Sequence, residues 1–167
     1  RPLEEGLVFV VDTLIGFGLR ENIKIIAAGK VFTSFHLLTK ISLGADIVSS
    51  ARGMMLALGC IQALKCNSNH CPVGVATTNP QLVRGLDVSD KSKRVARYHQ
   101  QTIHAFSEIL GAMGYENTDQ IERGDVFRRM ANGTVMSYEE LYPNLQKGSY
   151  LDEAHLPEMT TSLLKAF

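Results

Sequence analysis

The chain has 167 residues, and its 17 lysines and arginines balance its 17 aspartates and glutamates. This neutral balance argues against a nucleic-acid-binding protein, which needs a basic excess to neutralise phosphates. Hydrophobic residues make up 45% of the chain, as in ordinary globular domains, and no apolar run approaches the roughly 20 residues of a membrane span. The three cysteines are odd in number and close together, so we expect a reducing, cytoplasmic location rather than a disulfide framework.

The first part of the chain alternates helical and strand patterns. Apolar residues at three- and four-residue spacing predict a helix over 3–19, with Gly18 as its stop. Short apolar runs over 23–28 and 45–50 predict buried strands, and a helix capped by Thr33 or Ser34 lies between them. A further apolar helix is expected over 54–64. Strand, helix, strand and helix with short connections indicate a parallel α/β sheet.

The second part of the chain is predicted to be helical and then irregular. Residues 67–90 are rich in loop formers, and a long helix follows over 91–113 with Asp90 as its cap. We expect a shorter helix over 118–130, and a third short strand around 133–136. Ser137 and Glu140 have the spacing of a capping box. From residue 144 onward periodicity is lost, which predicts a surface tail or an arm on a partner.

Two convincing strands are too few for a complete sheet of this kind. A parallel pair needs cover on both faces and neighbours on its edges. A whole (β/α)8 barrel takes about 250 residues, so 167 residues with two strands correspond to about a quarter of a barrel with an extension. The sequence also begins with Arg1 rather than methionine. We therefore expect a piece of a longer α/β protein.

Small and basic residues follow each of the two predicted strands. Because the carboxyl ends of neighbouring parallel strands meet at one edge, these residues are expected to lie close together. Small residues let a phosphate approach the backbone, helix-start N–H groups favour an anion, and two cations add charge. Ordinary turn residues are the alternative interpretation. The candidate phosphate-binding residues are Ala28, Gly29, Lys30, Ser50, Ala51 and Arg52.

The cysteines form the pattern C-x5-C-x4-C-P, with Cys60, Cys66 and Cys71 within twelve consecutive residues. Thiolates are the usual ligands of iron–sulfur clusters, and three of them suit a three-iron cluster. Zinc is a competing metal if His70 supplies a fourth ligand, although the gaps are wider than those of zinc knuckles and His70 adjoins Cys71. Buried structural cysteines are the third hypothesis, most plainly for Cys60, which is expected on the apolar helix.

Two stretches resemble a known family. Residues 57–77, which carry the three cysteines and end in Cys-Pro-Val-Gly-Val-Ala-Thr, resemble the iron–sulfur segment of the glutamate synthase FMN-binding domain. Residues 25–53 are similar to the last two barrel strands of that family, where FMN phosphate is held. Alanine at positions 28 and 51, in place of the commoner glycine pairs, resembles the stand-alone glutamate-synthase-like flavoproteins. The resemblance extends over about residues 2–113.

The resemblance implies a fold and a chemistry. It implies the C-terminal part of a (β/α)8 TIM barrel, namely its last two strand–helix units, with an iron–sulfur loop and a helical C-terminal extension. FMN phosphate would lie on the six residues named above, and a 3Fe-4S cluster on Cys60, Cys66 and Cys71 would pass electrons to the flavin. The implied reaction is an oxidoreductase reaction of glutamate biosynthesis, the reductive amination of 2-oxoglutarate to L-glutamate. The family's catalytic residues lie mainly on earlier strands, so none is assigned here.

The expected organisation has four stretches: barrel units over 1–64, the iron–sulfur loop and linker over 65–90, the helical extension over 91–131 and an irregular tail over 132–167. Expected partners are the remainder of the barrel or another subunit, an electron-donor protein or reductase subunit, and a second copy of the chain. Two alternatives remain open. One is a small non-catalytic module with a structural zinc or free cysteines, and the other is a truncated product that has lost flavin binding.

Overall fold

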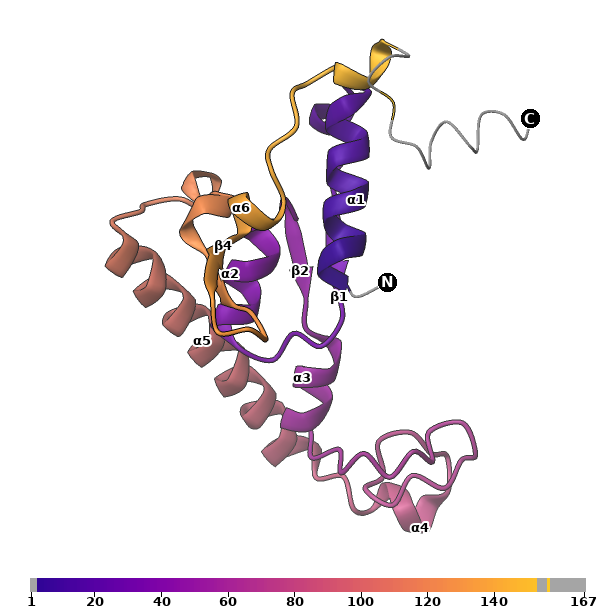
Figure 1. The fold of residues 1–167 in the computed structure, drawn as a ribbon. Coiled ribbons are helices and arrows are strands. Elements are labelled where there is room, and N and C mark those ends of the chain that lie inside the picture. The colour runs from indigo at the N-terminus through magenta and orange to yellow at the C-terminus, as the bar shows by residue number, and fades with distance from the viewer. Residues whose placement is uncertain (1–2, 153–155, 157–167) are drawn as a thin grey trace, which may run out of the picture. The chain divides into compact units, whose positions relative to one another are not determined.

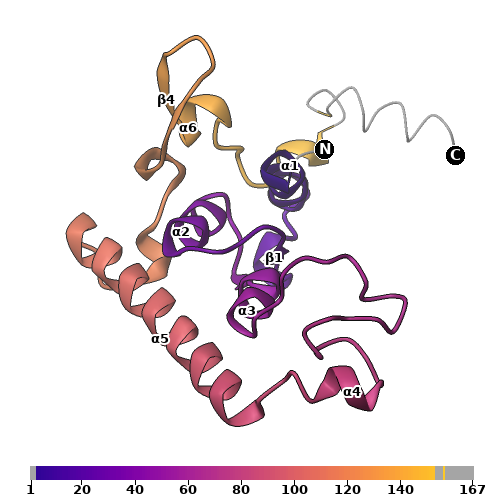
Figure 2. The same cartoon turned by 90° about the horizontal axis from the view of Figure 1, so that it is seen from below.

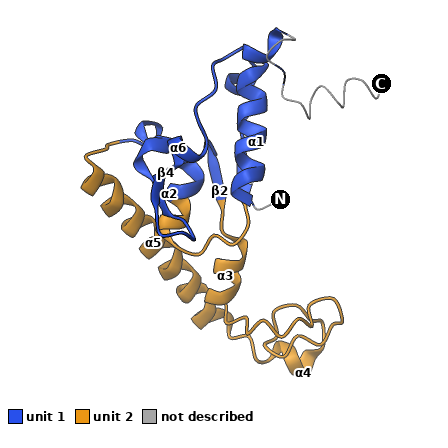
Figure 3. Cartoon of the chain, in the orientation of Figure 1, with its two compact units in different colours: residues 1–27, 38–48, 117–167 blue, residues 28–37, 49–116 orange. Residues whose placement is uncertain are grey.

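The computed structural model describes residues 3–152 and residue 156, which form a mixed α/β structure (Figure 1). The chain divides into two compact units (Figure 3). Unit 1 comprises Arg1–Ala27, Leu38–Val48 and Asn117–Phe167, and unit 2 comprises Ala28–Leu37 and Ser49–Glu116. Both strands of the first sheet and the helix between them contribute residues to both units, so each unit is discontinuous in sequence.

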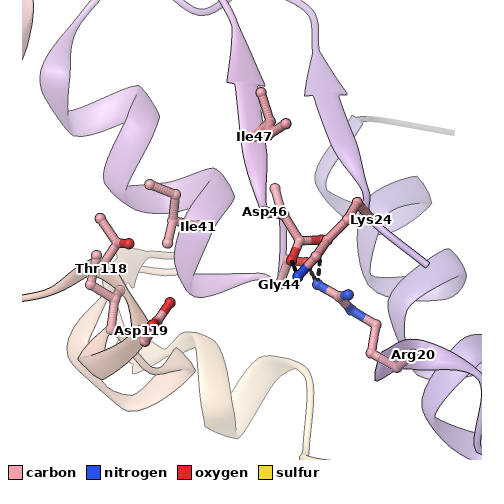
Figure 4. Close-up of a pocket in the computed structure, with 10 residues that line it drawn as sticks. Arg20, Lys24, Ile41, Gly44, Asp46, Ile47, Thr118 and Asp119 are labelled. Atoms are coloured by element: carbon pink, nitrogen blue, oxygen red, sulfur yellow. Dashed lines mark hydrogen bonds and ion pairs between the residues drawn. The ribbon is translucent and has the colours of Figure 1, made fainter. Parts of the chain in front are cut away.

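The first four predicted elements are present in the expected order. They are α1 (Leu3–Gly16), β1 (Ile26–Ala28), α2 (Ser34–Ser42) and β2 (Ile47–Ser49), with a 3-10 helix over Arg20–Asn22. β1 and β2 are hydrogen-bonded neighbours and run in the same direction (Figure 4). Each strand has three residues, which is shorter than predicted. The predicted strand–helix–strand order is therefore confirmed, although the strand lengths are not.

Helix α1 follows from the apolar spacing of its sequence. Leu7 and Val11 are buried, as the apolar spacing predicts. Val8 is also buried, whereas Val10, which the spacing places on the same face, is 45% exposed. The helix ends at Gly16, where the N–H of Leu19 donates to the Leu14 carbonyl at 2.7 Å. Gly18 precedes that closing bond with φ +70°, a left-handed conformation that glycine adopts without steric cost. The predicted stop at Gly18 is confirmed.

Unit 2 contains α3 (Ala51–Ala57), the short α4 (Pro80–Val83) and α5 (Val88–Met113). The helix predicted over 54–64 is wrong beyond residue 57, because residues 58–64 form a loop. Gln62 and Leu64 have positive φ angles, +56° and +54°, which no right-handed helix accommodates. Cys60 consequently lies in the loop after α3 and not on a buried helix.

Helix α5 confirms the long predicted helix and begins earlier than expected. Its cap is Asp87 and not Asp90, because the Asp87 carboxylate accepts the N–H groups of Ser89 and Asp90 at 2.9 and 3.3 Å. Gly114 ends the helix in a left-handed conformation. Within unit 2, α3 packs against α5 (Figure 2). This packing places α5 beside the residues that follow β2, because α3 begins directly after them.

The segment after α5 differs most from the prediction. The helix predicted over 118–130 is wrong, since two 3-10 helices and the strand β3 (Phe127–Arg129) occupy these positions. Side chains of Gln120 and Asp125 accept backbone N–H groups three residues earlier, which favours tight turns over a continuous helix. The strand expected around 133–136 is β4 (Val135–Ser137), and it pairs antiparallel with β3 in a hairpin.

The capping box and the start of the tail are ordered by local contacts. Ser137 Oγ accepts the Glu140 N–H at 3.1 Å and Glu140 accepts the Ser137 N–H at 2.6 Å, so the predicted capping box begins α6 (Tyr138–Leu141). The expected surface tail is wrong for residues 148–150. Gly148 N–H donates to the Ile15 carbonyl at 3.0 Å, and the Tyr150 ring packs edge-on against Phe17. The rest of the predicted tail, 153–155 and 157–167, lies outside the described residues.

The buried core of unit 1 lies between α1, the first sheet and the segment after residue 117. Among the described residues, no helix combines the length and apolar content that crossing a membrane requires. The most deeply buried apolar side chains of unit 1 are Val11, Ala27, Leu38, Leu43, Val126 and Tyr138.

Candidate functional site

Five of the six predicted phosphate-binding residues line one cavity in unit 2, with a volume of about 290 Å³. The first loop contributes its residues at the end of β1, and the second contributes the first two residues of α3. The structure therefore brings together residues that are about twenty positions apart in sequence. The cavity is lined by Ala28, Gly29, Lys30, Val31, Ser49, Ala51 and Arg52.

The cavity carries two positive charges. Lys30 and Arg52 are both exposed, and within residues 3–152 no carboxylate lies at ion-pair distance from either. Lys30 also has a left-handed backbone, with φ +51°, directly after Gly29 with φ +140°. A lysine held in this region costs about 1–2 kcal/mol of backbone free energy. Two unneutralised cations beside small residues are suited to an anion such as a phosphate.

Ser50, the sixth predicted residue, does not line the cavity. Its hydroxyl donates to the Val31 carbonyl at 2.7 Å and so joins the second loop to the first. The Tyr98 hydroxyl lies 3.3 Å from Ser50 Oγ and donates to the Phe32 carbonyl at 2.9 Å. The apolar spacing within the long helix predicts only that Tyr98 lies on its apolar face. The hydrogen bonds of its hydroxyl could not be predicted, because periodicity indicates which face of a helix is buried and not which groups a side chain pairs with.

The three cysteines occupy different environments in unit 2. Cys60 is half-buried, Cys66 is exposed and Cys71 is buried. Among the described residues, no group of three histidine, cysteine, aspartate or glutamate side chains gathers closely enough to hold a metal ion. His70 Nδ1 lies 2.6 Å from the Ser68 carbonyl, so that ring nitrogen is already paired with the backbone. The structure therefore does not bring the predicted metal ligands together at one point.

Cys71 has a backbone environment that stabilises a thiolate. The N–H groups of Ala76 and Val73, followed by those of Val75 and Gly74, lower the pKa of the Cys71 thiol, and partial burial opposes them. Converging N–H groups of this kind form an anion-binding concavity and favour the charged sulfur. The thiolate is the form that ligates iron or zinc. The backbone that follows Cys71 therefore favours the charged form of this sulfur.

Asn69 ties this stretch to the loop before it. Its backbone is left-handed, with φ +63°, and its carbonyl accepts the Thr77 hydroxyl at 2.6 Å. Its side-chain oxygen accepts the Thr78 N–H at 2.6 Å and the Thr78 hydroxyl at 3.2 Å. Nothing in the sequence analysis pointed to Asn69. The available signal is the residue type, since asparagine tolerates left-handed backbone and its side chain pairs with nearby N–H groups.

All four non-glycine residues with positive φ in the described part of the chain belong to these two segments. Lys30 lies in the cavity, and Gln62, Leu64 and Asn69 lie between Cys60 and Cys71. Such backbone strain is retained where surrounding contacts enforce it, and it concentrates at functional sites. Leu64 is 85% exposed, so burial of its own side chain does not explain its conformation. The strain independently marks the same two segments that the motifs indicate.

The two segments fit their implied groups to different degrees. The cavity offers two cations, small residues and no carboxylate, which fits a phosphate. The cysteine segment offers three thiols in twelve residues and a thiolate-stabilising pocket at Cys71, so its donor chemistry fits an iron–sulfur cluster. In the described residues, however, the three thiols do not lie close enough together to hold a cluster.

A larger cavity in unit 1, of about 600 Å³, is not a comparable candidate (Figure 4). Three of its four charged groups pair with one another, because Asp46 contacts Arg20 at 2.7 Å and Lys24 at 3.2 Å. Partial burial tends to raise the pKa of Asp46, but the Ile25 N–H and these two cations lower it below its ordinary value. The cavity lies at the start of the strands, and its polar groups serve the fold.

Comparison with known proteins identifies relatives of the chain. A family model described as a conserved region in glutamate synthase matches residues 1–116. The chain is 38% identical over 133 residues to the glutamate synthase large subunit-like protein YerD of Bacillus subtilis, which covers 79% of this chain and 25% of that protein. It is 35% identical over 140 residues to the archaeal glutamate synthase (NADPH) of Methanocaldococcus jannaschii, which covers 84% of this chain and 27% of that protein.

The chain spans about a quarter of the length of these two relatives. A third relative, the glutamate synthase (NADPH) large chain of Bacillus subtilis, is 32% identical over 126 residues, which is 8% of its length. The family model covers both candidate segments and ends at residue 116, before the segment that forms the β3–β4 hairpin. The match therefore includes every residue of the cavity and all three cysteines. This chain belongs to the glutamate synthase family.

Proposed function

We propose that the chain is the C-terminal part of an FMN- and iron–sulfur-dependent oxidoreductase that reductively aminates 2-oxoglutarate to L-glutamate. The observation that carries this proposal is the cavity in which two loops present Lys30 and Arg52 without a neutralising carboxylate. Family membership supports the chemistry, since the chain's relatives include an archaeal glutamate synthase and a glutamate synthase large subunit-like protein. The proposed activity belongs to the whole protein, of which this chain supplies the phosphate-binding end.

In this proposal the cavity holds the phosphate of FMN. Lys30 and Arg52 neutralise its charge, and the small side chains at Ala28, Gly29 and Ala51 let it approach the backbone. When bound, FMN supplies hydride-transfer chemistry, which no amino-acid side chain provides. This chain binds and orients the cofactor through its phosphate. It contributes no assigned catalytic residue.

We place β1 and β2 as the last two strands of a (β/α)8 barrel. Ile26 and Ile47 are 62% and 53% exposed although they lie on strands, and in the described residues β1 and β2 pair only with each other. Exposed apolar strand residues and open edges require neighbours. A chain that spans a quarter of its relatives supports the same proposal. The remaining strands would come from the rest of the protein or from another subunit.

Cys60, Cys66 and Cys71 are the proposed ligands of a 3Fe-4S cluster. Their C-x5-C-x4-C-P spacing and the N–H groups around Cys71 support this assignment. Assembly of the cluster would require residues 60–71 to close around it. The proposed organisation keeps barrel units over 1–64 and the iron–sulfur loop and linker over 65–90. The stretch expected as a helical extension, 91–131, ends in β3, and the stretch expected as an irregular tail, 132–167, begins with β4 and α6. An electron-donor protein or reductase subunit would then supply electrons.

The test is the cofactor content of the protein expressed from its complete reading frame and purified without oxygen. We expect stoichiometric FMN, about three irons per chain, and broad visible absorbance. Cys66→Ser should remove the iron and the absorbance, and because Cys66 is exposed the substitution leaves the core intact. A colourless protein that contains zinc, or one that contains neither flavin nor iron, would overturn the proposal.

The phosphate assignment needs a matched control for charge. Lys30→Met combined with Arg52→Met removes both cations of the cavity, and we expect flavin to be lost on gel filtration. Lys93→Met combined with Arg94→Met removes the same charge from exposed positions on α5 that do not line the cavity. Equal loss of flavin in both double variants would show that net charge, rather than this cavity, holds FMN.

A further inference from the structure

We infer that Tyr98 is a positioning residue of the phosphate cavity and that its hydroxyl sets the separation of the two loops. This inference rests on the proposed FMN site and extends it to a residue on α5. Tyr98 does not line the cavity, so it acts through other residues and touches no part of a bound phosphate.

The Tyr98 hydroxyl reaches both loops at once. It donates to the Phe32 carbonyl at 2.9 Å, two residues after Lys30, and it lies 3.3 Å from Ser50 Oγ, two residues before Arg52. Ser50 in turn donates to the Val31 carbonyl at 2.7 Å. These three contacts link the first loop, the second loop and the long helix. Removing the hydroxyl would leave the Phe32 carbonyl without this donor, and Ser50 Oγ would keep only its bond to the Val31 carbonyl.

Gly53 provides the space that this arrangement needs. A Cβ atom at position 53 would collide with the Tyr98 hydroxyl and with Ser50 Oγ at 2.5 Å. Gly53 is buried and lies in the first turn of α3 with an ordinary helical backbone. Its lack of a side chain is therefore required by the close approach of Tyr98, and not by an unusual backbone angle.

The helix that carries Tyr98 is itself held in place. α3 packs against α5 along unit 2, and Thr102 Oγ1 donates to the Tyr98 carbonyl one turn away at 2.7 Å. The half-buried ring is therefore anchored while its hydroxyl spans the loops. The contacts join the two loops that carry Lys30 and Arg52, the cations proposed to bind one phosphate. A change in the separation of the loops would weaken the binding of the phosphate by the two cations. It would not change the contacts made by the flavin ring.

This distinction gives a test that separates positioning from general folding. FMN and riboflavin share the flavin ring and differ in the phosphate. In the apoprotein prepared from the complete reading frame, quenching of flavin fluorescence measures the affinity for each. We expect Tyr98→Phe to weaken FMN binding by up to about tenfold, through loss of the hydrogen bond to the Phe32 carbonyl, and to change riboflavin binding by less than about twofold.

Three further variants complete the experiment. Ser50→Ala and Gly53→Ala disturb the same contacts from the second loop, so each should reproduce the selective loss of FMN if Tyr98→Phe fails to fold. Tyr142→Phe is the matched control, because Tyr142 lies in unit 1 against Tyr138 and has no part in the cavity. It should leave both affinities unchanged.

The outcomes are distinct. A selective loss of FMN affinity in Tyr98→Phe with an unchanged control supports the inference. Equal losses for FMN and riboflavin, or no loss, would overturn it and leave the proposed FMN site standing. A wild-type protein that binds FMN no better than riboflavin would overturn the proposed phosphate site, and the inference with it.

Discussion

The guanidinium of Arg123 lies 2.6 Å from the carboxylate of Asp12 on α1. It also donates to the carbonyls of Tyr142 and Pro143 at 2.9 and 3.2 Å, and its side chain is only 6% exposed. Arg123 follows the part of the chain that matches the family model, which ends at residue 116. Within unit 1, this one side chain therefore fastens the segment after the family region to the first helix.

Asp12→Ala should destabilise unit 1 strongly, because it leaves the buried guanidinium of Arg123 without its counter-charge. We expect the free energy of unfolding to fall by about 3 kcal/mol, measured by urea denaturation followed by circular dichroism. Glu21→Gln is the control, since it removes the exposed ion pair with Lys147 and should cost less than about 1 kcal/mol. Equal costs for the two variants would contradict the buried-pair explanation.

The contribution of Asp46 to stability should depend on pH in the acid range. Its pKa is lowered in the folded protein: partial burial opposes this, but the Ile25 N–H, Lys24 and Arg20 prevail. A carboxyl with a lowered pKa stabilises the fold above its unfolded pKa of about 4, and this stabilisation is lost as the pH falls through the folded value. The stability difference between wild type and Asp46→Asn should be constant from about pH 7 to 5 and shrink below about pH 4. A difference that grows in acid would contradict this assignment.

Two substitutions of Lys30 should separate its charge from its backbone. Lys30→Ala and Lys30→Gly both remove the cation, and both should weaken FMN binding about tenfold or more. Glycine also relieves the left-handed conformation at φ +51°, so Lys30→Gly should be about 1 kcal/mol more stable than Lys30→Ala. Thermal unfolding and flavin titration measure the two effects. Retention of FMN affinity in either variant would show that the cation takes no part in binding.

Asn69→Ala should impair metal loading without unfolding the protein. The substitution removes the acceptor for two Thr78 donors and disfavours the left-handed backbone. Residues that support metal ligands in this way are typically worth about 10- to 100-fold in metal affinity. Iron and sulfide per protein, measured after reconstitution under limiting iron, should therefore fall.

The chain offers a close control for that experiment. Asn132 accepts the Thr134 N–H at 3.1 Å and the Thr134 hydroxyl at 2.7 Å in the turn between β3 and β4. Asn132→Ala removes the same kind of contact far from the cysteines in sequence and should leave the iron content unchanged. Equal losses of iron in the two variants would point to general instability.

The order of the first elements was predictable because helix and strand periodicity is local. The ends of the elements were not. The composition of residues 58–64 predicts a helix, but the left-handed conformations of Gln62 and Leu64 interrupt it. A left-handed leucine cannot be predicted from its residue type. The helix expected over 118–130 fails for a different reason. Side chains such as Gln120 and Asp125 pair with nearby backbone N–H groups, and these short-range bonds compete with helix formation.

The cavity was predictable because it depends on topology. When two strands run in parallel, the residues after them meet at one edge, and the structure gathers five of the six proposed positions there. The role of Ser50 was not predictable, because its hydroxyl turns to the Val31 carbonyl and away from the cavity. Tyr98 bonds to the Phe32 carbonyl, which is distant in sequence, and no residue pattern reveals such a contact. The only sequence signal for Asn69 is its residue type.

The phosphate cavity and the cysteine segment both lie in unit 2. The segment between Arg52 and Cys60 is short. Most of it belongs to α3, which packs against α5. Electron exchange between two redox centres weakens steeply as the gap between them widens. With both proposed binding segments built into one compact unit, the separation between the proposed phosphate site and the cysteines would be set by packing within that unit.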